Sequence, residues 1–198
     1  MIEAIPQYSH ISEKEYYALE ERAEIKHDYL DGEIFDMSDG SPDHALLVLN
    51  VGAAIAARLH GHPCYATSSE QRIKIEHTGL ITYPDVAIVC PPARYDPANS
   101  HTLLNPRAVV EVLSRTTEDY DQRIKIEHYS SVESLTHYIL VRQDRVEVVR
   151  YERETGGKWS RSAHTARSSA LRLRYLGLDV PLDEIYEPLD LPEVSAER

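Results

Sequence analysis

The chain has 198 residues, of which 42% are hydrophobic, and a formal net charge of −12 at pH 7. This length suffices for one domain with an ordinary hydrophobic core, and we expect a single domain over residues 1–198 with its core at about 12–187. The acidic balance disfavours a general nucleic-acid binder, because affinity for phosphate backbones comes mainly from lysine and arginine.

The N-terminal residues show no basic segment followed by an apolar one, and no apolar run reaches the roughly 18 residues of a membrane-spanning helix. We therefore expect a cytoplasmic protein without a membrane partner. Cys64 and Cys90 lie far apart in the sequence and match no zinc or redox spacing, so a reducing interior is the simplest setting.

The first expected elements are a helix and a hairpin. Ser12 and Glu15 have the spacing of a helix capping box, which predicts a helix over residues 15–26. The turn sequence Asp31-Gly32 lies between two apolar runs and predicts a hairpin over residues 27–37.

A second helix is expected over residues 44–61, after the start signal Ser41-Pro42-Asp43. Small and apolar residues lie almost all round this helix, which predicts that it is buried.

The heptapeptide QRIKIEH occurs at residues 71–77 and again at 122–128. In the first copy the isoleucines and Gln71 share one face of a period-two pattern, which predicts a half-buried strand. Arg72 and Lys74 fall on the other face, with the charged residues, and are expected to point to solvent. The flanking sequences of the two copies do not match, so we do not infer a duplication.

The second copy is expected to be helical. The residues expected to cap this helix and to occupy its first turn are Thr116 or Thr117, Glu118 and Asp119. The apolar face predicted at 100° per residue comprises Ile124, His128, Val132 and Leu135. Asp121 and Lys125, one turn apart, lie within or at the edge of that face.

Two mostly apolar strands are expected at residues 82–90 and 108–114, with a loop over 91–106 between them. The later elements are expected strands at 137–141, 145–153 and 158–167 and a final strand and short helix within 176–186. Together these elements predict an α/β fold of mixed α+β character, with a central mixed β-sheet flanked by helices.

Residues 138–175 are basic against the acidic average, with nine basic and four acidic residues. A basic segment beside an acidic body suits a metal-dependent enzyme that acts on an anionic polymer. Solvated strand faces carry such charges too, so both interpretations stay open.

Two carboxylates interrupt the apolar strands. Glu111 lies in the run AVVEVLS, and Asp85 lies near the start of the strand over 82–90. An isolated buried carboxylate costs several kcal/mol unless it is paired, protonated or bound to a cation. The pair could ligate a divalent cation such as Mg²⁺, serve as acid and base in glycoside hydrolysis, or form structural ion pairs.

Lys125 favours the first of these uses. A cation facing inward on the helix after the Glu111 strand suits phosphoryl chemistry, which needs positive charge near the nucleophile and the leaving oxygen. The competing interpretation is a helical ion pair between Asp121 and Lys125, one turn apart.

These residues resemble a known nuclease superfamily. Pro84-Asp85, Glu111-Val112-Leu113, Asp121 and Lys125 are similar in order and spacing to the PD-(D/E)XK nucleases, and more closely to the Uma-type restriction endonucleases of bacteria. The resemblance covers roughly residues 12–187. It implies a restriction-endonuclease-like fold, and a Mg²⁺ ion, which Mn²⁺ can replace, held by Asp85, Glu111 and the backbone carbonyl of Val112.

The chain departs from the superfamily pattern at Leu113, which stands where the motif lysine is expected, two residues after Glu111. In the Uma-type proteins the lysine has moved to the following helix, so the resemblance makes Lys125 its replacement. Lys74, in the first heptapeptide, is not a catalytic candidate.

Three further residues are lesser, accessory candidates. Glu33, just after the hairpin turn, could be another metal ligand or an exposed cross-strand charge. His44 could be an acid or base, although a lone histidine on a buried helix is more often a hydrogen-bonded core residue. Gln71 could position a water molecule.

The function that the resemblance implies is a Mg²⁺-dependent endonuclease that hydrolyses phosphodiester bonds of DNA. The alternative is a nuclease-like binding or interaction module with little or no hydrolysis, which the overall acidity and Leu113 favour. Cleavage of both strands with one centre per chain would favour a homodimer with two-fold symmetry.

Overall fold

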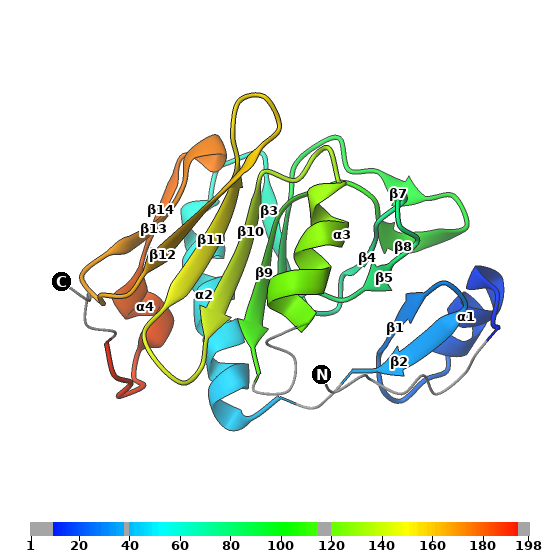
Figure 1. The fold of residues 1–198 in the computed structure, drawn as a ribbon, viewed down its shortest axis with the longest axis horizontal. Coiled ribbons are helices and arrows are strands. Elements are labelled where there is room, and N and C mark those ends of the chain that lie inside the picture. Colours follow the sequence, from blue (N-terminus) through cyan, green and yellow to red (C-terminus); the bar gives the residue numbers. More distant parts are fainter. Residues whose placement is uncertain (1–9, 38–39, 115–119, 194–198) are drawn as a thin grey trace.

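A computed structural model describes residues 10–37, 40–114 and 120–193. Its largest layer is a sheet with the strand order β12-β11-β10-β9-β6-β3 (Figure 1). The strands are β3 (Tyr65–Ser68), β6 (Val86–Val89), β9 (Pro106–Leu113), β10 (His137–Arg142), β11 (Val148–Arg153) and β12 (Trp159–His164). β9 and β10 are parallel and the other neighbours are antiparallel, which confirms the central mixed sheet.

A helical crossover joins the two parallel strands. After β9 the described chain resumes in a short π-helix, η1 (Tyr120–Lys125), which continues into α3 (Ile126–Ser130) and leads to β10. Parallel neighbours need such a crossover, because a tight turn cannot return the chain to the starting edge. The helix expected from the second heptapeptide is therefore confirmed, whereas its predicted caps at 116–119 lie outside the described residues.

The sheet is covered on both faces. α3 lies in front of β9 and β10 in Figure 1, and α2 (Pro42–Arg58) lies behind them. Alternate strand residues serve the two sides: Val110 packs in one cluster with Val51 of α2, and Val109 packs in the other with Tyr129 of α3. This alternation fixes which face each polar residue of β9 must occupy.

A second sheet has the order β2-β1-β5-β4-β8-β7 and carries α1. Its elements are α1 (Glu13–Glu20), β1 (His27–Leu30), β2 (Glu33–Asp36), β4 (Arg72–Lys74), β5 (Ile81–Thr82), β7 (Tyr95–Asp96) and β8 (Asn99–Leu103). The rings of Tyr16 and Tyr29 stack with centroids 5.1 Å apart and fix α1 to the sheet. The hairpin at Asp31-Gly32 is confirmed, and both turn residues have positive φ.

The capping box at α1 is confirmed, since Ser12 and Glu15 exchange side-chain and backbone hydrogen bonds. The helix ends at Glu20 and not at residue 26 as expected. The following residues turn back so that His27 can pair with Asp36 in the hairpin and bind Glu20 through its ring.

The C-terminal elements pack against α2. They are β13 (Ala170–Leu173), the 3₁₀-helix η2 (Arg174–Leu176), β14 (Leu178–Pro181) and α4 (Leu182–Tyr186). Arg58 of α2 holds α4 through a bidentate pair with Glu184, both bonds being 2.8 Å long. The expected final strand and short helix are confirmed, but β13 was missed.

Two expectations are wrong, one about the exposure of a helix and one about the secondary structure of a connecting segment. α2 is not buried all round, since Leu49 is 67% exposed and several alanines of the same face are open. The segment 91–106 is not a simple loop, because it contains the hairpin of β7 and β8. Small apolar residues predict a buried helix only where a second layer exists to cover it.

The first heptapeptide is a strand, as expected, but its charged face does not point to solvent. Arg72 is only 6% exposed, and Lys74 forms ion pairs of 2.6 Å with Glu13 and 2.8 Å with Asp96. The physical reason is α1, which covers this face of the second sheet. In the second heptapeptide Ile124 is 47% exposed, so it does not belong to the buried face as predicted.

The two cysteines form a disulfide, which their separation in the sequence did not predict. Cys64 precedes β3 and Cys90 follows β6, and the antiparallel pairing of Tyr65 with Val89 places the two cysteines opposite one another. The sequence separation of 26 residues therefore gives no argument for a reducing setting.

Among the described residues, no helix is both long and apolar enough to cross a membrane.

We expect the double variant Cys64→Ser, Cys90→Ser to be less stable than the oxidised protein by about 3 kcal/mol. The reason is that the disulfide closes a loop between residues 26 positions apart and so restricts the unfolded chain. Urea denaturation with and without a thiol reductant measures the difference. Reductant should destabilise the wild type and leave the double variant unchanged. Equal curves for the oxidised wild type and the variant would contradict the assignment of the disulfide.

Candidate active site

Asp85 and Glu111 lie opposite one another on neighbouring strands. The antiparallel register pairs Val86 with Val110, so the next pair outward is Asp85 and Glu111. Because alternate residues of a strand face the same side of the sheet, both acids lie on the side that faces α3. The negative charge of Asp85 contributes to raising the pKa of Glu111, as expected of carboxylates in one neighbourhood. The two acids singled out by the sequence are thus brought together.

Lys125 reaches the same place from η1. Its Nζ lies 3.1 Å from Glu111 Oε1 and 3.3 Å from Asp121 Oδ1. All three side chains are nearly inaccessible, with 5% to 7% exposure. The two interpretations of Lys125 therefore do not exclude each other, because the helical ion pair with Asp121 holds the ammonium beside Glu111.

Two tyrosines complete this cluster. The hydroxyl of Tyr129 in α3 donates to Glu111 Oε1 at 3.4 Å, and the hydroxyl of Tyr138 in β10 donates to the backbone carbonyl of Asp121 at 3.0 Å. The second bond ties η1 to the sheet at the residue that pairs with Lys125. A π-helical turn is rare and often occurs at functional sites.

Burial dominates the electrostatics of the cluster. It raises the pKa of Glu111 to about 8; the charge of Lys125 opposes this shift, and the charges of Asp121 and Asp85 reinforce it. For Lys125 burial acts to lower the pKa, but the carboxylates of Glu111, Asp121 and Asp28 outweigh it and hold the pKa well above its usual value. The ammonium is thus permanently charged.

Asp28 is the member of the cluster that the sequence did not reveal. It lies in β1, and burial raises its pKa, while the charge of Lys125 lowers it. Its buried Oδ1 has no hydrogen-bond partner among the described residues. The alternation in HDYL, which puts Asp28 on the face opposite Tyr29, was the available signal, but only the tertiary structure shows which layer faces it.

His44, at the start of α2, approaches Asp85 from another side. Its Nε2 lies 3.5 Å from Asp85 Oδ2, and hydrogen bonding to Asp85 raises the pKa of His44 against the effect of burial, with a smaller contribution from the Val112 backbone. Asp85 Oδ2 also accepts the backbone N–H of Val112 at 2.7 Å. The role of the Val112 carbonyl as a metal ligand stays a prediction.

The other accessory candidates lie elsewhere. Glu33 is exposed at the start of β2, where it pairs with Leu30. The amide of Gln71 donates to the carbonyls of Arg72 and His101, on the second sheet. Neither has a described contact with Asp85.

The oxygen donors of the cluster limit which metal ion it can hold. No three His, Cys, Asp or Glu side chains in the described ranges form a ready metal-binding group. The acids nevertheless fit a hard cation such as Mg²⁺, which uses few carboxylates together with backbone oxygen and water. Two features of the acids are compatible with a cation: Oδ1 of Asp28 has no hydrogen-bond partner among the described residues, and burial, with smaller contributions from Asp121 and Asp85, makes the charged form of Glu111 unfavourable without one.

Most of the basic residues at 138–175 form ion pairs or hydrogen bonds within the protein. Its arginines pair with acids nearby, as in Arg172 with Asp179 at 2.9 Å and Arg174 with Glu152 at 2.6 Å. Arg153 donates to the carbonyls of Leu135, Ser130 and Val132 and stacks on Trp159, with 4.7 Å to the ring centroid. These contacts favour the interpretation of solvated strand faces.

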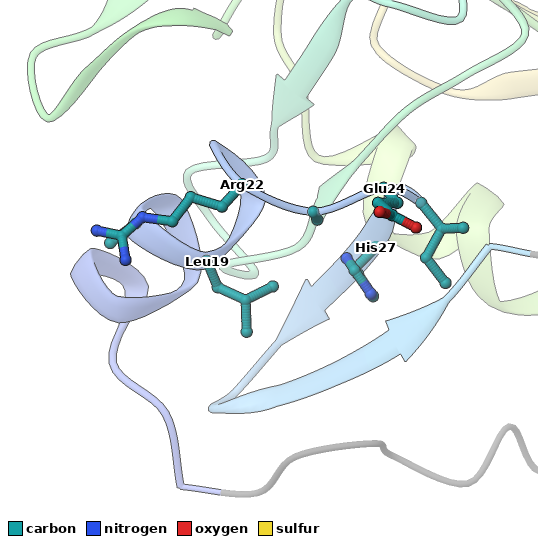
Figure 2. A pocket seen from close by; sticks show the side chains of 7 residues that line it. Leu19, Arg22, Glu24 and His27 are labelled. Atoms are coloured by element: carbon teal, nitrogen blue, oxygen red, sulfur yellow. The ribbon is translucent and has the colours of Figure 1, made fainter.

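Two hollows lie near the end of α1 and not at this cluster. One, of about 560 Å³, is lined by residues 18–19, 22–25 and 27; Figure 2 shows Leu19, Arg22, Glu24 and His27 around it. The other, of about 480 Å³, adjoins it and includes Arg72 and Tyr83. Neither of these two hollows is lined by the acids of the candidate centre.

The fold defines the class. A crystal structure described as that of a "putative nuclease" from Anabaena variabilis superposes with a TM-score of 0.68 over 83% of this chain and 91% of its own, at 14% identity. The restriction-endonuclease-like fold expected from the sequence is therefore confirmed.

The chain belongs to the Uma2 family, described as "Putative restriction endonuclease", whose model matches residues 13–183. Two proteins of Synechocystis sp. are similar to it. Uncharacterized protein slr1290 is 35% identical over 90% of this chain and 93% of its own length, and uncharacterized protein sll1609 is 25% identical over 73% and 82%.

We expect Glu111 to lower the stability of the metal-free protein as the pH rises from about 4.5 to about 8, by a few kcal/mol relative to a variant without this acid. In this range folded Glu111 keeps its proton while the unfolded chain releases it, so rising pH favours unfolding. Urea denaturation at pH 5, 6.5 and 8 should show that the stability of Glu111→Gln increases relative to that of the wild type as the pH rises. Glu127→Gln, an exposed acid of α3, is the control and should follow the wild type. Parallel curves for all three proteins would contradict the raised pKa.

Proposed function

We propose that the protein is a Mg²⁺-dependent endonuclease that hydrolyses phosphodiester bonds of DNA. The observation that carries the proposal is the gathering of Asp28, Glu111 and Asp121 around the ammonium of Lys125, with Asp85 opposite Glu111 on the neighbouring strand. Burial disfavours the charged form of Glu111 and Asp28, and a divalent cation would stabilise that charged form.

Asp85 and Glu111 would hold the cation, with the carbonyl of Val112 as a further oxygen ligand. Bound there, Mg²⁺ would supply Lewis-acid stabilisation of the phosphate and activation of water. Glu111 must lose its proton to take part, because a protonated carboxyl is a poor ligand. Because Glu111 lies beside Lys125 and opposite Asp85, binding of the cation would release the proton of the Glu111 carboxyl group.

Lys125 would stabilise the negative charge that develops on the phosphate oxygens during hydrolysis. An ammonium already fixed in place needs no reorganisation at the moment of reaction, which is the source of such electrostatic catalysis. Asp121 and Asp28 act on this group as positioning residues: the first binds the ammonium directly, and the second lies close enough to raise its pKa.

DNA as the substrate is supported by the family description and by the phosphoryl chemistry that the cluster suits. One such centre per chain cuts one strand, so double-strand cleavage would need two chains related by two-fold symmetry. A homodimer is therefore part of the proposal for that mode of cutting.

The first test is nicking of supercoiled plasmid with Mg²⁺ or Mn²⁺. We expect the wild type to nick, and Asp85→Asn and Glu111→Gln to lose at least about a hundredfold in rate, because each removes a ligand charge. Asp28→Asn should lose about tenfold, as expected when a residue acts through another.

Glu33→Gln is the matched control, since Glu33 is an exposed acid on the same hairpin as Asp28. It should nick like the wild type when purified in the same way. Equal nicking by Asp85→Asn and the wild type would show that the activity does not belong to this site.

The second test is calorimetric titration with Mn²⁺. Asp85→Asn should lose binding, whereas Lys125→Met should bind at least as tightly as the wild type, because it removes a competing positive charge, and yet should not nick DNA. This combination separates the role of Lys125 from that of the ligands. If Mn²⁺ binding does not depend on Asp85, the alternative of an inert nuclease-like module is favoured. Leu113, which stands at the position of the motif lysine, supports the same alternative.

A further inference from the structure

Arg72 is a buried cation on the face of the second sheet that α1 covers. It is 6% exposed, and its guanidinium lies over the rings of Tyr17, Tyr16 and Tyr83, at 5.0, 5.8 and 5.7 Å from their centroids. The aromatic faces attract the positive charge and hold the guanidinium in one orientation.

The hydrogen-bond partners of Arg72 are neutral. Nε donates to Thr102 Oγ1 at 3.0 Å, and Nη2 donates to Asn99 Oδ1 at 3.3 Å. Nη1 is buried and has no hydrogen-bond partner among the described residues. Within these residues no carboxylate forms an ion pair with Arg72, in contrast to the neighbouring Lys74, which has two. A buried charge without a counter-ion is costly, and an anion would relieve that cost.

A hollow of the right size adjoins this guanidinium. It measures about 480 Å³ and is lined by residues 20, 23–26, 70, 72, 83 and 101. This volume is in the range of small-molecule sites. Lys26 adds a second cation, whose Nζ lies over the Tyr83 ring at 5.6 Å from its centroid.

Three acids line the hollow, of which Glu24 is exposed to solvent and the other two are bonded within the fold. Glu70 pairs with Lys26 at 2.5 Å. Glu20 accepts hydrogen bonds from the Tyr83 hydroxyl and from the backbone of His27, and its other oxygen lies 2.9 Å from the His27 ring. The group in this hollow with an unmet hydrogen-bonding need is therefore the guanidinium, a planar donor that suits carboxylate and phosphate oxygens.

We propose that this hollow binds a small oxyanion, a phosphate or carboxylate group, through Arg72 with Lys26 at its side. The site is distinct from the candidate active site: Arg72 lies with Tyr29 on the α1 face, whereas Asp28 points through the opposite face of the same sheet. It does not depend on the proposed nuclease activity.

The test is calorimetric titration of the full chain at low salt with inorganic phosphate, dAMP and acetate. We expect saturable one-site binding of at least one of them, with a dissociation constant of about 1 mM or tighter. Tighter binding of dAMP than of phosphate identifies a nucleotide as the source of the anion, and preference for acetate identifies a carboxylate. Absence of saturable binding of all three by the wild type overturns the proposal.

Variants locate the bound anion. Arg72→Gln keeps hydrogen-bonding capacity without charge and should weaken binding at least about tenfold, whereas Arg94→Gln, an exposed arginine, should not change it. Lys26→Gln, which removes a partly exposed cation, should weaken binding several-fold and serves if Arg72→Gln does not fold. Unchanged binding in both variants, or loss of binding in Asp85→Asn, would place the anion elsewhere and overturn the proposal.

Discussion

The buried contact between Lys125 and its carboxylates is the constraint on which the rest of the structure depends. Removing charges from water is costly, and the cost is met only if each charge finds partners in good geometry. Lys125 meets Glu111 from a central strand and Asp121 from its own helix. The cluster thus joins η1 to β9, and a change in either element would leave a buried charge uncompensated.

This constraint also links the two sheets. Asp28 comes from β1, in the sheet that carries α1, and yet its charge acts on Lys125 of the other layer. The second sheet, which carries α1, is therefore part of the candidate centre. Its two faces carry different buried groups: the acid Asp28 is on one, and the cation Arg72 is beneath α1 on the other.

The sequence predicted the parts of the centre that violate a local pattern. Asp85 and Glu111 stand out because carboxylates are anomalous in apolar strands, and Lys125 stands out because helical spacing turns it inward with Asp121. Asp28 gave no such signal, since a charged residue in a short hairpin is ordinary. The surroundings of Arg72 and Lys74 were predicted wrongly for the same reason: period two tells which residues share a face, but not whether a distant helix covers it.

The π-helical turn of η1 has a consequence for how the chain tolerates changes in length. A π-turn closes its hydrogen bonds one residue later than an α-turn does, so it contains a residue that an α-helix would not accommodate. Deleting exposed Ile124 would let the segment close as an ordinary α-helix, at no cost to its backbone bonding. Because a π-turn and an α-turn each complete one full turn about the helix axis, Lys125 would still face the acids, but Asp121 and Lys125 would stand three residues apart and not four. Chain length in this one turn, as much as the identity of any side chain, therefore sets the spacing between the lysine and the acid that binds it.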